Sequence, residues 1–129
     1  YIDEEIEWLR EVVKSKEWRK AAHRIVMIHI PPASQPMRDI EALNKILCWG
    51  SKSWGEKALD IFNRADVDLM ISGHTHKYFF VPERKGEQNY PLIINDNRSA
   101  MSVKIEEEGI AVKVTNLDGE VLLDEQFKD

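Results

Sequence analysis

The chain has one cysteine, no long apolar run and no excess of positive charge. Cys48 is the single cysteine, which excludes an internal disulfide and a cysteine-rich zinc site. No apolar run approaches the roughly 20 residues that a transmembrane helix needs. A formal charge of −5 gives no basic surface for nucleic acid, although a bound metal ion can still attract a phosphate group locally. The sequence therefore indicates neither a membrane-spanning nor a nucleic-acid-binding protein.

The composition itself is that of an ordinary soluble globular protein, because 43% of the residues are hydrophobic and 32% are charged. At 129 residues we expect a single domain, residues 1–129. The sequence begins at Tyr1, with neither a methionine nor a targeting segment. We therefore expect a piece of a longer polypeptide, and we make no prediction of its localisation.

Residues 1–78 alternate between helical and strand patterns. Apolar residues at helical spacing predict a helix over residues 2–13, with Asp3 as its cap. Residues 24–30 are nearly all apolar and predict a strand buried on both faces. Part of the next segment, residues 37–47, is predicted to be helical. A capping-box pattern at Ser53 begins a helix that is predicted to reach about Ala65, and a second strand follows at residues 67–72.

The rest of the chain reads as a series of strands. Alternating apolar residues and turn signals at Gly109 and Gly119 predict a half-solvated antiparallel sheet. The predicted strands are residues 77–82, 90–95, 101–106, 110–117 and 121–127. We therefore predict an α/β (α+β) fold, in which a β-α-β unit in residues 1–78 is followed by an antiparallel strand-rich tail in residues 79–129.

Three histidines are the candidate metal ligands. His29 lies at the end of the first predicted strand, and His74 and His76 follow the second, after Gly73. Parallel strands end at the same edge of a sheet, where open α/β sheets place ligands. Imidazole binds zinc, iron, manganese and nickel. The spacing predicts a metal site at this edge, with Gly73 allowing the backbone to turn sharply.

Two arrangements of these ligands stay open. In an extended segment His74 and His76 point to the same face, whereas in a turn they can point toward two different ions. One ion would then take His29 and one residue of the pair, and a second ion would take the other residue. The structural alternative is that His29 only bonds to backbone and that the pair His74 and His76 binds no metal. His23 is interpreted as a solvated surface residue.

Other residues near this edge give weaker indications. Two tryptophans, Trp49 and Trp54, either wall a substrate pocket or anchor a loop. The basic residues available for phosphate contacts are Arg38, Lys52 and Arg98. A two-metal hydrolase also needs a bridging ligand, often a carboxylate, and no such motif occurs here. Asp66 and Asp68 lie at the wrong end of their strand, so we predict no catalytic residue within this chain.

The order of these motifs resembles the C-terminal half of calcineurin-like metallophosphoesterases, in particular bacterial members related to purple acid phosphatases. The resemblance rests on a helix that carries Trp8-Leu9 and on residues 25–32 and 68–78, and it covers residues 1–78. It implies a four-layer α/β/β/α sandwich with two divalent or trivalent ions, iron, zinc or manganese. By resemblance, His29 and His74 would bind one ion and His76 the other. The family's remaining ligands, an Asp-x-His, a bridging Asp and an Asn-His, come from an N-terminal half and are absent here.

The resulting functional prediction is the C-terminal portion of a metal-dependent phosphohydrolase, inactive as an isolated fragment. Whether the phosphoester is a monoester, a diester or a nucleotide stays open. The missing N-terminal half would pair with the core sheet, so self-association through an exposed sheet edge is expected. The alternatives are a non-catalytic binding module that retains the fold and a site completed by another chain of an oligomer.

Overall fold

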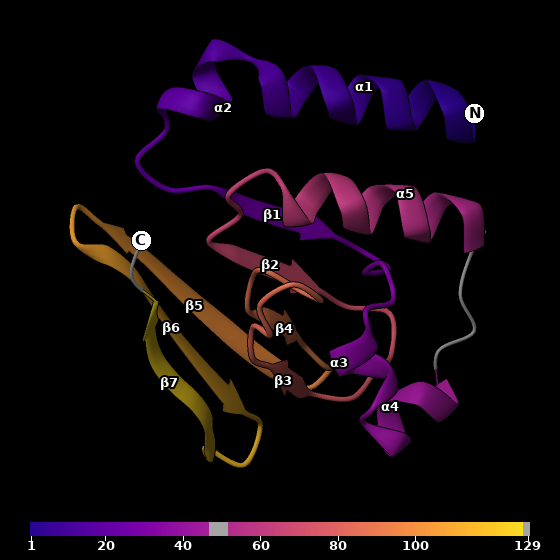
Figure 1. The fold of residues 1–129 in the computed structure, drawn as a ribbon. Coiled ribbons are helices and arrows are strands. Elements are labelled where there is room, and N and C mark those ends of the chain that lie inside the picture. The colour runs from indigo at the N-terminus through magenta and orange to yellow at the C-terminus, as the bar shows by residue number, and fades with distance from the viewer. Residues whose placement is uncertain (47–51, 128–129) are drawn as a thin grey trace.

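A computed structural model describes residues 1–46 and 52–127, which form two β-sheets and five helices (Figure 1). The first sheet has the strand order β1-β2-β4-β3. Strands β1, β2 and β4 run parallel to one another, and β3 pairs antiparallel with β4. Their bounds are β1 (Ile25–Ile28), β2 (Leu69–Ser72), β3 (Phe79–Val81) and β4 (Leu92–Ile94).

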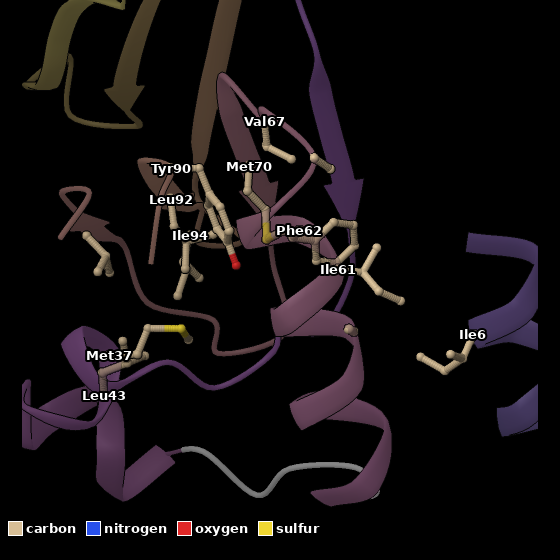
Figure 2. Close-up of a cluster of buried hydrophobic side chains, with 13 residues drawn as sticks. Ile6, Met37, Leu43, Ile61, Phe62, Val67, Met70, Tyr90, Leu92 and Ile94 are labelled. Atoms are coloured by element: carbon tan, nitrogen blue, oxygen red, sulfur yellow. The ribbon is translucent and has the colours of Figure 1, made fainter. Parts of the chain in front are cut away.

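The helices pack on one face of this first sheet. Helix α5 (Lys52–Asn63) lies beside α1 (Ile2–Lys14), and both contribute to a core that also contains Met70 of β2 and Leu92 of β4 (Figures 1 and 2). Three shorter helices border the same core: α2 (Lys16–Lys20), α3 (Gln35–Arg38) and α4 (Glu41–Ile46).

The second sheet covers the other face of the first. It is an antiparallel meander of β5 (Ser99–Glu106), β6 (Gly109–Asn116) and β7 (Val121–Phe127). Leu69 and Ile93 of the first sheet pack in one buried cluster with Val112 and Leu123 of the second. The described residues thus form a helix layer and two sheet layers. This mixed α/β architecture confirms the predicted β-α-β unit and the antiparallel tail, although β3 and β4 join the first sheet.

Strand β1 differs most from its prediction. It pairs with β2 on one side, and no described strand pairs with its other side. Its Met27 side chain is 79% exposed, so the expectation of burial on both faces was wrong. A run of apolar residues cannot by itself distinguish a central strand from an edge strand.

Two helix starts also differ from the sequence prediction. The N-cap of α1 is Tyr1 and makes no side-chain hydrogen bond, while Asp3 lies inside the helix and pairs with Lys57 at 3.6 Å. Helix α5 already includes Lys52, so its start is not the capping box predicted at Ser53. The predicted helix over residues 37–47 is replaced by α3 and α4, which Asp39 and Ile40 separate, and its last residue lies outside the described range.

Candidate functional site

Three parallel strands end at one edge of the first sheet. His29 follows β1, the Gly73–His76 segment follows β2, and Asn95 follows β4. Hydrogen bonds connect these segments, because Gly73 N donates to His29 O at 3.2 Å and Asn95 N donates to Ser72 O at 2.9 Å. The arrowheads of β1 and β2 point the same way in Figure 1. The predicted convergence of strand ends is therefore present.

His29 and His74 lie against each other at this edge. His74 Nδ1 is 3.4 Å from His29 Nε2, and the two rings are nearly perpendicular, with an interplanar angle of 84°. This separation exceeds the roughly 2.7–3.2 Å of ordinary protein hydrogen bonds. Two nitrogens bound at about 2.0–2.1 Å to one tetrahedral zinc ion stand about 3.3–3.4 Å apart. The separation of the two ring nitrogens therefore matches that of two ligands of such an ion.

A tight turn sets the position of the His74 ring. Thr75 N donates to Gly73 O at 2.9 Å across His74, whose φ is +73°, and this combination is a γ-turn. The sharp bend thus lies at His74 and not at Gly73, where it was predicted. Gly73 instead lies against His29, since a Cβ added there would be 3.8 Å from His29 Nδ1.

Two histidines of this segment, one in the turn and one just after it, have a costly backbone conformation. His76 also has a positive φ, +59°. A non-glycine residue in this region costs on the order of 1–3 kcal/mol and requires support from its surroundings. Thr75 supplies some of it, because its buried hydroxyl donates to Lys77 O at 2.8 Å and accepts from Lys77 N at 3.3 Å. Such strain is concentrated at functional sites in proteins.

His76 is not brought together with the other two histidines. Its side chain is exposed, and no group of three or more histidine, cysteine, aspartate or glutamate side chains suited to a metal ion occurs in residues 1–46 and 52–127. The assignment of His76 to a second ion stays a prediction. His23, interpreted above as solvated, is half-buried, and its Nε2 lies 2.6 Å from Glu106 O. It therefore ties the start of β1 to the end of β5.

The third strand end, which carries Asn95, was not predicted from the sequence. Asn95 donates through Nδ2 to Ser99 O at 3.0 Å, and its Oδ1 is buried without a hydrogen-bond partner in the described part of the chain. Asp96 follows it and accepts from Arg98 N at 2.8 Å. Both were overlooked because residues 90–95 were assigned to the antiparallel tail. Polar residues directly after the apolar run of β4 were the available signal.

The acidic residues before β2 lie at the opposite end, as expected. Asp68 accepts a hydrogen bond from Arg24 N at 2.7 Å, at the start of β1. Beside the histidine pair, an open cleft of about 820 Å³ includes His29, Arg38, Lys52 and Trp54 in its lining. Trp54 therefore walls a cleft, while Trp49 lies outside the described residues.

Comparison with known proteins found no matching family model and no matching curated protein. A solved structure of vacuolar protein sorting 29 from Cryptosporidium parvum is similar, with 21% identity and a TM-score of 0.42. The match covers 67% of this chain and 49% of that one, so the chain spans about half the length of that protein. A similarity this weak carries no argument about activity.

These comparisons correct the family resemblance. The assignment to the C-terminal half of a bacterial calcineurin-like metallophosphoesterase related to purple acid phosphatases was wrong, because no family model and no curated protein of that kind matches the chain. Motifs of a few residues also occur without common descent, so they do not establish a family by themselves. In the described ranges, no helix is both long enough and apolar enough to cross a membrane.

Proposed function

We propose that this chain supplies part of the metal centre of a metal-dependent phosphohydrolase. The observation that carries the proposal is the 3.4 Å separation of His29 Nε2 and His74 Nδ1 at the carboxyl edge of a parallel sheet. The positive φ of His74 supports it, because backbone strain of this kind is concentrated at functional sites. A metal ion bound there would neutralise phosphate oxygens and lower the pKa of a coordinated water.

Two imidazoles do not complete such a centre. Within the described residues no third suitable side chain joins the pair. The remaining ligands would come from another part of a longer polypeptide or from a partner chain. We therefore expect the chain by itself to bind one zinc, iron or manganese ion weakly and to hydrolyse no phosphoester. The ion proposed for His76 would also need ligands from outside the described residues.

Metal titration tests this proposal. Isothermal titration with Zn²⁺ should show one site that weakens about tenfold or more in His74→Ala and in His29→Ala, because each substitution removes one of two ligands. His23→Ala is the matched control and should bind Zn²⁺ like the native chain, since His23 contacts Glu106 at the opposite end of β1. Binding of less than one Zn²⁺ per chain, with the same stoichiometry in His74→Ala, would contradict the metal site.

An activity assay tests the incompleteness of the site. The purified chain should not hydrolyse p-nitrophenyl phosphate with Zn²⁺, Mn²⁺ or Fe²⁺ present, because its described residues offer too few ligands. Turnover that depends on added metal and disappears in His74→Ala would show that the chain completes its own site.

A second candidate function, a binding module, is favoured by the open edge of the sandwich. Met27 lies on the same face of β1 as Ile25, which packs between the sheets, yet it is 79% exposed. Val103 and Ile105 pair with buried residues of β6 and so share the inner face of the second sheet, but they are 37% and 59% exposed. These three side chains, together with the edge of β1 that no described strand covers, offer an apolar, strand-binding surface.

Self-association through this edge is the corresponding prediction. Met27→Lys should lower the sedimentation coefficient at high protein concentration toward that of a monomer, because a charge on an edge strand opposes strand pairing. The substitution should leave the melting temperature unchanged, since Met27 is largely exposed. Equal self-association of both proteins would argue against this surface.

A further inference from the structure

The cleft beside His29 has an apolar floor and a charged rim. Its volume is about 820 Å³, within the range of small-molecule sites. The floor consists of Ile28 and Ile30 with the buried Pro31 and Pro32, and α5 adds Trp54 to one wall. The charged lining residues are exposed and belong to α1, α3 and α5: Glu5, Arg38, Lys52 and Glu56. His29 belongs to the lining, so the cleft adjoins the histidine pair.

The floor of the cleft favours an apolar occupant. Proline has no backbone N–H, so Pro31 and Pro32 present only carbon and carbonyl groups. A sugar or another polyhydroxylated group placed on this floor would leave hydroxyls without partners, and each unpaired polar group reduces affinity. An aromatic ring could instead lie against the indole of Trp54 and the two isoleucines.

We infer that this cleft binds the organic part of the phosphoester, an apolar and preferably aromatic alcohol, while the phosphate lies at His29 and His74. This inference rests on the proposed function, since it takes the phosphate position from the metal site. A bound ester would extend from the histidine pair across His29 to Trp54. The substrate class is thus a phosphoester of an aromatic or aliphatic alcohol rather than a sugar phosphate.

Gly55 allows the cleft to be filled without disturbing the fold. It lines the cleft next to Trp54, and a Cβ added there would meet no atom within 4 Å. Leucine is also a better helix former than glycine, so Gly55→Leu should keep α5 intact. The matched control is Ser53→Leu, which adds the same side chain to an exposed position of α5 outside the cleft lining.

The test uses 2-naphthol and 2-naphthyl phosphate as probes and the indole N–H signal of Trp54 in ¹H–¹⁵N spectra as the readout. We expect 2-naphthol to shift this signal saturably in the native chain and in Ser53→Leu, and to bind about tenfold or more weakly to Gly55→Leu. With Zn²⁺ present, 2-naphthyl phosphate should bind more tightly than 2-naphthol, and this gain should disappear in His74→Ala. Glucose 6-phosphate should not displace 2-naphthol.

The outcomes separate the two proposals. If Zn²⁺ binds the histidine pair but 2-naphthol leaves the Trp54 signal unmoved, or binds Gly55→Leu equally well, the inference about the cleft is overturned and the metal site stands. If 2-naphthol binds in the cleft but Zn²⁺ adds nothing for the phosphate ester, the metal function fails, and with it the assignment of the cleft to a phosphoester.

Discussion

Gln88 offers a sharp test of how the fold holds the segment that carries His29. Its side chain is completely buried and connects two parts of the chain. Its Oε1 accepts a hydrogen bond from the Ser34 hydroxyl in the loop after β1, and its Nε2 donates to Tyr90 O at 3.0 Å before β4. The amide therefore joins the loop after His29 to the connection between β3 and β4.

We predict that Gln88→Leu lowers the free energy of unfolding by about 2–4 kcal/mol. The substitution keeps the volume but leaves the Ser34 hydroxyl and the Tyr90 carbonyl buried without this partner, at a cost of about 1–3 kcal/mol each. The added apolar burial of leucine offsets a part of that cost. Gln126→Leu, at an exposed position of β7, should change stability by less than about 0.5 kcal/mol.

Urea denaturation followed by circular dichroism measures these differences. A double-mutant cycle with Ser34→Ala should give a coupling energy of about 1 kcal/mol or more, because the two side chains are in direct contact. Ser34 also accepts from Met37 N at the start of α3, and the cycle separates that contribution. A Gln88→Leu chain as stable as the native one, or an additive cycle, would refute the reasoning.

Two further predictions concern glycine and tyrosine. Gly109→Ala should lower the free energy of unfolding by about 2–3 kcal/mol in thermal melts, because φ is +155° and the new Cβ would lie 2.5 Å from Phe127 O. At Gly119 φ is +81° and an added Cβ would meet no atom within 4 Å, so Gly119→Ala should cost only about 1 kcal/mol. Equal losses of stability in the two variants would contradict the clash at Gly109. Burial raises the pKa of the Tyr90 hydroxyl above its usual value. Above about pH 10 the unfolded chain therefore releases a proton that the native chain keeps, and the free energy of unfolding falls. Tyr90→Phe removes this loss, so the unfolding free energy of the variant should rise relative to that of the native chain between about pH 9 and pH 11. If the two plots of unfolding free energy against pH ran parallel, the burial of the hydroxyl would be contradicted.

Periodicity in the sequence was sufficient to find most elements of the fold. Apolar runs located β1 and β2, and alternation located β5 to β7, because these patterns record which faces are buried. It did not reveal that β4 lies parallel to β2 in the first sheet. That arrangement depends on contacts between distant segments, such as Met70 with Leu92, which no local pattern encodes.

The candidate site was predictable only in part. The meeting of His29 and His74 followed from parallel strands ending at one edge. The γ-turn at His74 did not, since a positive φ at a non-glycine residue is disfavoured locally and is maintained by surrounding bonds such as those of Thr75. The exposure of Met27 could not be predicted from local sequence either, because it depends on which segment pairs with β1.

The two sheets differ in the sequence separation of the segments that pair in them, and this difference sets an order of folding. The start of β1 bonds to Asp68 across 44 positions of sequence, whereas β5 and β6 meet across the Glu107-Glu108 turn. Closing a long loop delays contact formation, and hairpins form within microseconds. We expect the β5–β6–β7 meander to form first and to present its apolar face, including Val112 and Val114, as the template on which the parallel strands assemble. The histidine pair would then be among the last features of the molecule to appear.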